Sequence, residues 1–168
     1  AISDNGRWAV GCFDRQGMLI DLESDAITLI DNFDCLDVAD DGVIAGATYA
    51  DSQSGEAALY INGQSIKVDL SELTKSDMSS FQAITPDGTF AVGWWWEYDP
   101  NSYYGKIYDT IVPFAYDILK DRITVLEAGD TLYGTGAVAP YGVTADRRIV
   151  GCEQGYAMMA VLWEDEYS

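Results

Sequence analysis

A short phrase that recurs four times is the feature that most limits how this chain of 168 residues can fold. Each copy has an apolar residue, a small polar turn that usually contains Asp and Gly, and an apolar run that ends in Gly. Repeats spaced by tens of residues indicate an array of one supersecondary unit. The four copies occupy residues 2–11, 38–46, 84–93 and 143–151.

The third copy shows most clearly which structure the unit forms. Residues 83–85 predict a short strand, and 86–88 (Pro-Asp-Gly) predict a tight turn because these residue types suit turn conformations. Residues 89–96 are rich in β-branched and aromatic side chains and predict a second strand. A hairpin from 114–118 to 123–126 completes a unit of four antiparallel strands. Equivalent outer hairpins are expected from 18–22 to 26–30 and from 57–61 to 65–70.

The second strand of each unit is apolar on both alternating faces, as is typical of a strand covered on both sides. In the third unit Phe90, Val92 and Trp94 face one way, whereas Ala91 and Trp95 face the other. A repeated four-stranded sheet with buried inner strands is the blade of a β-propeller. A parallel β-helix and a sandwich are the alternatives, and the turn-strand-hairpin order favours the propeller.

We therefore predict an all-β fold, a β-propeller-like array of about four four-stranded antiparallel blades in one domain, 1–168. The approximate blades are 1–34, 35–80, 81–140 and 141–168. Neither end supplies the missing outer strand, so we expect part of a larger propeller continued in a longer chain. A compact four-blade assembly and a dimer of two halves are the alternatives. The glycines that end the second strands are expected where neighbouring backbones approach closely near a central axis: Gly11, Gly46, Gly93 and Gly151.

The charge balance limits the classes of molecule that the chain can bind. With 9 Lys and Arg against 28 Asp and Glu, the formal net charge is −19. Nucleic acid and anionic membrane surfaces are disfavoured, because both are bound through clustered cations. The chain has no His, which excludes Ser-His-Asp and Cys-His catalytic arrangements and His-based metal sites. No apolar run is long enough for a membrane span. We expect no cofactor and no metal.

Three cysteines are too few for a disulfide framework. Cys12 and Cys152 each follow the Gly that ends a repeated phrase, and on stacked sheets such positions lie beyond disulfide reach. We expect Cys12, Cys35 and Cys152 to be small buried apolar side chains.

The repeated phrase I-S-x-D-G-x-x-x-V-G, followed by an apolar stretch and a turn, resembles the HAF-type extracellular repeat of secreted bacterial β-propellers. Its second half appears at 58–63 and at 160–163. The third unit departs by a long insertion, and the fourth has Arg147 where the turn glycine would stand. The resemblance implies a propeller and an extracellular, periplasmic or cell-surface location, and it carries no catalytic residues.

The best candidate site is the aromatic segment that begins at Trp94. Aromatic rings beside carboxylates suit the stacking and hydrogen bonding of sugars, and they also suit protein partners. The alternative is that Trp94 and Trp95 pack between blades while the tyrosines cover the insertion. We expect a non-catalytic binding or scaffold module with a carbohydrate or protein ligand. The candidate binding residues are Trp94, Trp96, Glu97, Tyr98, Asp99, Tyr103, Tyr104 and Tyr108.

The abundant carboxylates suggest an alternative function and a metal site, and only the alternative function agrees with the sequence. A carboxylate-dependent glycoside hydrolase or lyase is the alternative function, because two carboxyl groups suffice for glycoside hydrolysis. A calcium loop starting at Asp31 fails, since Leu36 and Gly42 would occupy its sixth and twelfth positions. The recurring acidic residue of each turn is expected to bond its own turn backbone: Asp4, Asp41, Asp87 and Asp146.

Overall fold

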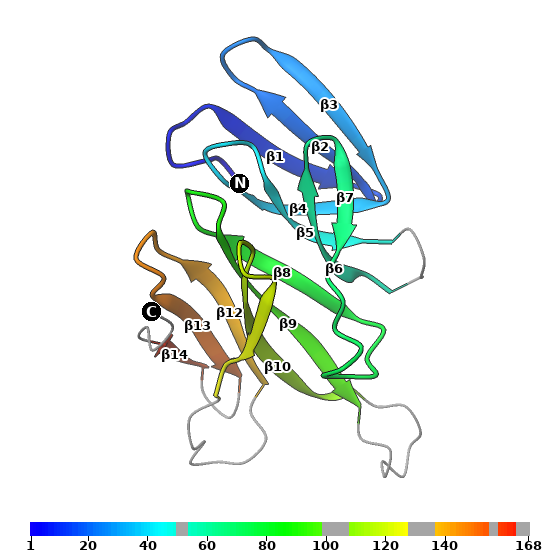
Figure 1. Ribbon diagram of the computed structural model, residues 1–168, viewed down its shortest axis with the longest axis vertical. Coiled ribbons are helices and arrows are strands. Elements are labelled where there is room, and N and C mark those ends of the chain that lie inside the picture. The colour runs from blue at the N-terminus through cyan, green and yellow to red at the C-terminus, as the bar shows by residue number, and fades with distance from the viewer. Residues whose placement is uncertain (50–53, 99–107, 128–136, 155–157, 164–168) are drawn as a thin grey trace.

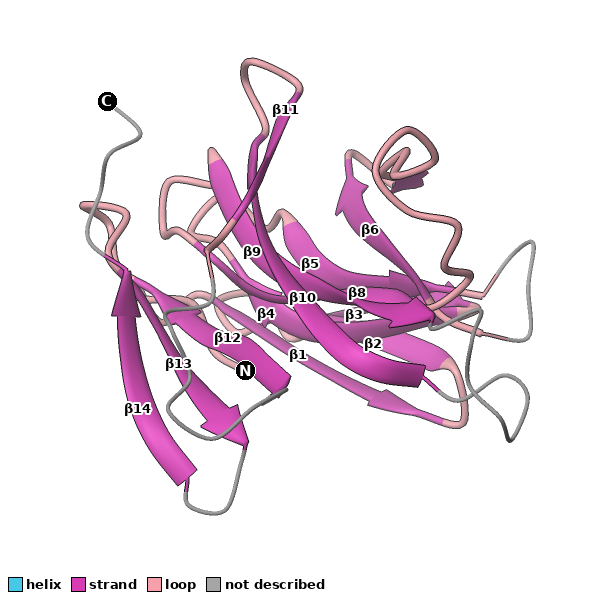
Figure 2. Cartoon of the chain, turned by 90° about the horizontal axis from the view of Figure 1, so that it is seen from below, coloured by secondary structure: helices cyan, strands magenta, loops and turns pink. Residues whose placement is uncertain are grey.

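The computed structural model describes residues 1–49, 54–98, 108–127, 137–154 and 158–163. Strands and the loops between them make up all of this described part (Figure 2). The strands form four antiparallel sheets, in each of which neighbouring strands are consecutive in the chain. The predicted all-β array of four antiparallel units is therefore confirmed.

The sheets follow one another in chain order, from β1–β3 at the top of Figure 1 to β12–β14 at its lower left. Sheet 1 contains β1 (Trp8–Phe13), β2 (Gln16–Asp21) and β3 (Ala26–Asp31). Sheet 2 contains β4 (Phe33–Val38), β5 (Ile44–Thr48), β6 (Glu56–Ile61) and β7 (Gln64–Lys67). Sheet 3 contains β8 (Ser79–Ile84), β9 (Phe90–Tyr98), β10 (Tyr108–Asp117) and β11 (Arg122–Val125). Sheet 4 contains β12 (Ala137–Val143), β13 (Ile149–Gln154) and β14 (Met158–Trp163).

Sheets 1 and 4 have three strands each within the described residues, and in sheet 4 the outer strand is the one lacking, as expected for the last unit. In sheet 1 the innermost position is held by a short piece of chain before β1. Ile2 bridges Ala9 in antiparallel fashion, and Ala1 and Val10 exchange hydrogen bonds of 2.9 and 3.0 Å. Ala1–Ser3 therefore occupies the place that β4, β8 and β12 hold in the other sheets.

Apolar clusters join each sheet to the next. Val10 of β1 packs with Phe33 and Ile44 of sheet 2. The two faces of β9 enter different clusters, as the alternation predicted: Trp95 lies with residues of sheet 2, and Val92 with residues of sheet 4. The inner strands β4, β8 and β12 each pack on the preceding sheet, and β8 contacts both β4 and β12, which gives the array a radial order.

Gly46, Gly93 and Gly151 lie within β5, β9 and β13 rather than at the strand ends, and each faces a β-bulge on the inner strand of its own sheet. The extra, unpaired residues of the bulges are Leu36, Gln82 and Tyr141. A Cβ at Gly46 would lie 1.8 Å from the backbone oxygen of Asp34, and one at Gly93 would lie 2.4 Å from that of Ser80. The predicted close approach is present, but it occurs within a sheet, because the bulge pushes a carbonyl toward the glycine.

The repeated phrase forms a turn that is held by side-chain hydrogen bonds. In the third unit Thr85 Oγ1 donates to Asp87 Oδ1 at 2.6 Å and accepts from Phe90 N at 3.1 Å. Asp87 Oδ1 also accepts from Thr89 N at 3.1 Å, and Asp41 accepts likewise from Val43 N at 3.0 Å.

The acidic-turn prediction fails at Asp4. In the first turn Asn5 Oδ1 accepts from Arg7 N at 2.9 Å, because Asn5 rather than Asp4 aligns with Asp87. In the fourth turn Asp146 bonds the Thr144 hydroxyl and the Arg148 guanidinium.

The three cysteines are free thiols in three different environments. Cys35 is buried, as predicted, and burial raises the pKa of its thiol to about 11. Cys152 is half-buried. The prediction is wrong for Cys12, which is exposed.

Candidate functional site

The three consecutive tryptophans of β9 divide between its two faces. The rings of Trp94 and Trp96 meet edge to face, with centroids 6.2 Å apart. Trp95 points the other way, is 3% exposed and packs on Phe114 with ring centroids 5.4 Å apart. Trp95 is therefore a core residue, and Trp94 and Trp96 are the two that a ligand could reach.

Glu97 lies with Trp95 and not with Trp94. Its Oε2 accepts a hydrogen bond from Trp95 Nε1 at 2.9 Å and one from Thr74 Oγ1 at 3.5 Å. These bonds hold the carboxylate against the side of β9 that faces sheet 2. The structure thus separates Glu97 from the two accessible tryptophans with which it was grouped.

The other candidates lie at or beyond the strand ends. Tyr98 and Tyr108 are paired across β9 and β10, and nothing further is described of their side chains. Asp99, Tyr103 and Tyr104 lie outside the described residues.

Trp94 lines a cleft of about 250 Å³ between the inner strands of sheets 2 and 3. We call it the Trp94 cleft. Its apolar lining includes Trp94, Tyr49 and Leu36, and its polar lining includes Asp34 and Gln82. Leu36 and Gln82 are the bulge residues of β4 and β8, and bulges commonly re-aim a side chain next to a site.

The polar groups of the cleft are held in fixed positions. The Tyr49 hydroxyl donates to Asp34 Oδ2 at 2.7 Å, and the Arg15 guanidinium lies 4.6 Å over the Tyr49 ring. Burial first, and then the hydrogen bond to Asp34, raise the pKa of Tyr49 to about 12. Gln82 Nε2 donates to Ser80 Oγ and Phe81 O, each at 3.3 Å. The cleft therefore offers two aromatic surfaces beside fixed oxygen acceptors.

A second cavity, of about 270 Å³, lies at the opposite end of the inner strands. All four units contribute to it, and its lining includes Ile2, Asp37, Ile84 and Val143. Asp37 accepts hydrogen bonds from Ile84 N and from Val38 N, both at 3.0 Å, and burial raises its pKa. This carboxylate ties β4 to β8, so we regard the cavity as part of the structural hub.

The described lining of the Trp94 cleft supplies aromatic surfaces and hydrogen-bonding groups. Glycoside hydrolysis requires two carboxyl groups across the bond. Asp34 is the one carboxylate in the described lining of the cleft, and it is bonded to Tyr49. Within the described residues, no group of three or more His, Cys, Asp or Glu side chains could hold a metal ion.

Sequence reasoning missed Tyr49, Asp34 and Gln82. Tyr49 follows directly after an apolar strand, which is a weak signal, and Asp34 belongs to the segment that was considered only as a calcium loop. The position of Gln82 depends on a bulge, which leaves no mark in the sequence.

Radially ordered antiparallel sheets, built from one repeated turn-strand-hairpin unit, define a β-propeller fold. No family model matches this chain, and no curated protein is detectably similar to it in sequence. The solved structure of a putative TolB from Agrobacterium tumefaciens is similar, with a TM-score of 0.66 at 14% identity, over 96% of this chain and 55% of that one.

TolB from Acinetobacter baumannii gives a TM-score of 0.49 at 14% identity, over 97% of this chain and 42% of that one. The chain thus spans about half the length of these structures. The likeness to the Agrobacterium structure confirms the β-propeller fold. The described part of the chain contains no helix with the length and apolar character that a membrane crossing requires.

Proposed function

We propose that this chain is a non-catalytic binding or scaffold module whose contact surface is the Trp94 cleft. The observation that carries the proposal is the cleft itself, in which Trp94 and Tyr49 flank fixed polar groups. Ligand sites typically combine such apolar walls with a few positioned hydrogen-bonding groups. The resemblance of the repeated phrase to secreted repeats supports an exported location.

The size of the cleft limits the ligand. At about 250 Å³ it is smaller than the ~300–1,000 Å³ of sites for drug-sized molecules, so it accommodates one ring-sized group. A sugar ring fits this chemistry, because its C–H face stacks on Trp94 and its hydroxyls donate to Asp34 or Gln82. We propose a carbohydrate ligand, with an aromatic side chain of a protein partner as the competing occupant.

In the proposal, four tyrosines and one aspartate among the remaining candidates extend this surface. Tyr98, Asp99, Tyr103, Tyr104 and Tyr108 belong to the segment that follows Trp96 along the chain. Their contribution is tested by a Tyr103→Ala/Tyr104→Ala double variant, which we expect to weaken binding without changing the melting temperature.

A glycan array and a titration followed by tryptophan fluorescence test the proposal. We expect a glycan that changes the fluorescence of the wild-type chain and binds Trp94→Ala at least about tenfold more weakly, a loss of about 1.4 kcal/mol. Tyr141→Ala is the matched control, because Tyr141 is 54% exposed and does not line the cleft. No binding to any glycan would contradict the carbohydrate ligand. Binding that Trp94→Ala and Tyr141→Ala weaken equally would contradict the site.

A further inference from the structure

Two of the three cysteines lie at the same place in the junction between sheets 1 and 2. Cys12 is in β1 and Cys35 is in β4, and β1 packs along β4. Cys12 lies on the face of β1 that carries Val10, because side chains two positions apart on a strand point the same way. Val10 and Cys35 belong to one apolar cluster. The side chains of both cysteines are therefore directed into the space between the two sheets.

A glycine leaves room for the two sulfur-bearing side chains to meet. Cys12 is paired with Gly17 across β1 and β2, and side chains paired in this way stand on one face with Cβ atoms about 4.5–5.5 Å apart. A Cβ at Gly17 would lie 2.6 Å from the Cys35 sulfur. The Cys35 sulfur thus occupies the space that a side chain next to Cys12 would otherwise fill. Disulfide-bonded cysteines need a similar closeness, with Cβ atoms about 3.5–4.5 Å apart.

Each thiol also reaches the backbone of the sheet that carries the other cysteine. The Cys12 thiol lies within hydrogen-bonding distance of the Cys35 N–H and of the Asp34 carboxylate. The Cys35 thiol lies within hydrogen-bonding distance of the Met18 N–H on β2. Bonding the two sulfurs therefore requires rotation of the side chains rather than movement of a strand.

Neither thiol has the character of a reactive catalytic cysteine. Burial raises the pKa of Cys35 to about 11, and burial followed by the negative charge of Asp34 raises the pKa of Cys12. Redox-active cysteines have a lowered pKa because their thiolate is stabilised, and this stabilisation makes their disulfides easy to reduce. Because neither thiolate is stabilised here, the pair is suited to a stable structural disulfide.

We propose that Cys12 and Cys35 form a disulfide that joins sheets 1 and 2 when the chain meets a disulfide oxidant such as oxidised glutathione. The Cys12 sulfur attacks one sulfur of the oxidant, and the first glutathione leaves. The Cys35 sulfur then attacks the Cys12 sulfur of the mixed disulfide, and the second glutathione leaves. The two cysteine S–H bonds are replaced by one S–S bond, and both protons end on the two glutathione thiols. Exported proteins meet such oxidants, whereas cytosolic thiols are kept reduced.

The test uses the full chain, reduced and then incubated with oxidised glutathione under native conditions. Digestion with trypsin places Cys12 in peptide 8–15 and Cys35 in peptide 16–67. We expect mass spectrometry without reductant to find these two peptides linked by one disulfide. Both thiols still free, glutathione retained on Cys12, or a bond from either cysteine to Cys152 or to a second chain would overturn the proposal.

Stability gives an independent measurement, because a disulfide restricts the unfolded chain. The melting temperature of the oxidised wild type should exceed that of the reduced wild type by roughly 5–10 °C. Cys12→Ser and Cys35→Ala should show no such difference, whereas the matched control Cys152→Ser should keep it. An equal rise in Cys12→Ser would overturn the proposal. Trp94→Ala should form the disulfide as the wild type does, which separates this inference from the ligand of the Trp94 cleft.

Discussion

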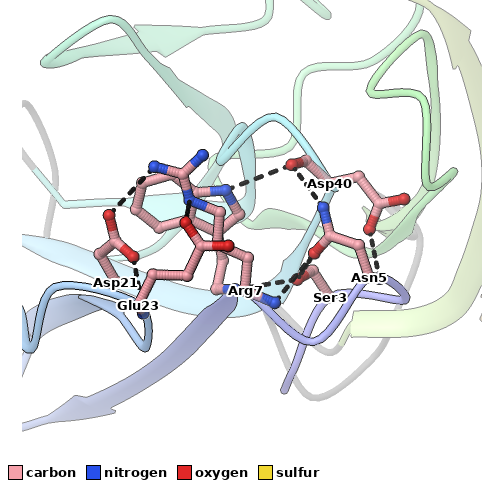
Figure 3. A network of polar contacts seen from close by, with 7 residues as sticks. Ser3, Asn5, Arg7, Asp21, Glu23 and Asp40 are labelled. Atoms are coloured by element: carbon pink, nitrogen blue, oxygen red, sulfur yellow. Dashed lines mark hydrogen bonds and ion pairs between the residues drawn. The ribbon is translucent and has the colours of Figure 1, made fainter.

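Asn5 and Asp40 bind each other reciprocally across the junction of sheets 1 and 2. Asp40 Oδ1 accepts from Asn5 N at 2.8 Å, and Asn5 Nδ2 donates to Asp40 O at 3.0 Å. Figure 3 shows this pair beside Ser3, whose hydroxyl donates to Asn5 Oδ1 at 2.8 Å. The first turn of the repeat is therefore hydrogen-bonded to the second through Asn5, one of its own residues.

Replacing Asn5 tests this fastening. Asn5→Ala removes the bonds to Asp40 O, Ser3 and Arg7 N, so it should lower the free energy of unfolding by about 1–2 kcal/mol in urea titrations. Asp4→Ala is the neighbouring control and should stay within about 0.5 kcal/mol of the wild type. A larger loss from Asp4→Ala would show that the turn is held differently.

Removing a tryptophan from one face of β9 should cost much more stability than removing one from the other face. Trp95→Ala should cost about 3–5 kcal/mol, because it empties a site in the core against Phe114. Trp94→Ala removes a half-buried ring from the wall of a cleft and should cost about 1 kcal/mol. Thermal and urea unfolding of both variants measure the difference. Equal losses would contradict the assignment of one ring to the core and the other to the cleft.

The bulge glycines should be intolerant of any side chain. Gly46→Ala brings a methyl group into collision with the Asp34 carbonyl, so we expect a loss of more than about 4 kcal/mol or failure to fold. Gly11→Ala provides the contrast, since its methyl group enters open space. Soluble expression and the unfolding midpoint give the comparison. A well-folded Gly46→Ala chain would mean that the bulge can relax.

Acid should weaken the junction of sheets 3 and 4 through Asp117. Burial raises the pKa of this carboxyl, but the Lys120 N–H and the charges of Lys120 and Arg147 outweigh it, so its pKa lies below the ordinary value. Lys120 Nζ and Arg147 Nη1 each lie 3.3 Å from Asp117 Oδ2. A carboxyl with a lowered folded-state pKa stabilises the fold above its unfolded pKa of about 4 and loses that contribution as the pH falls through the folded value.

Asp117→Asn checks the sign of this effect. The melting temperature of the variant should fall below that of the wild type at pH 7, and the gap should narrow as the pH drops below about 4. A gap that is constant from pH 7 to pH 2 would show that the charge of Asp117 is not what stabilises the junction.

Tyr49 should resist ionisation. Burial and the Asp34 carboxylate raise its pKa to about 12, so at pH 11 its ring signals should have moved by only about a tenth of their full titration, whereas an ordinary tyrosine, with a pKa of about 10, is largely ionised. Asp34→Asn removes the negative charge and should lower the pKa of Tyr49. Ring proton shifts followed from pH 8 to pH 11 measure both.

The repeats made most of the fold predictable, because the second strand of each unit is apolar on both alternating faces and is therefore recognisable as a buried strand. The assignment of Val92 and Trp95 to opposite sides of β9 followed from alternation alone and is confirmed by their two clusters. The bulges at Leu36 and Gln82 were not predictable, because a bulge depends on the register of the partner strand. For the same reason the sequence indicated Trp94 but not Tyr49, which a different repeat brings to the cleft.

The main packing contacts join each sheet to its immediate neighbours along the chain. Such a molecule behaves as a one-dimensional series of coupled units, whose stability is close to a sum of unit and junction terms. A substitution at one junction is therefore expected to loosen that junction first, while the packing of the more distant sheets stays intact.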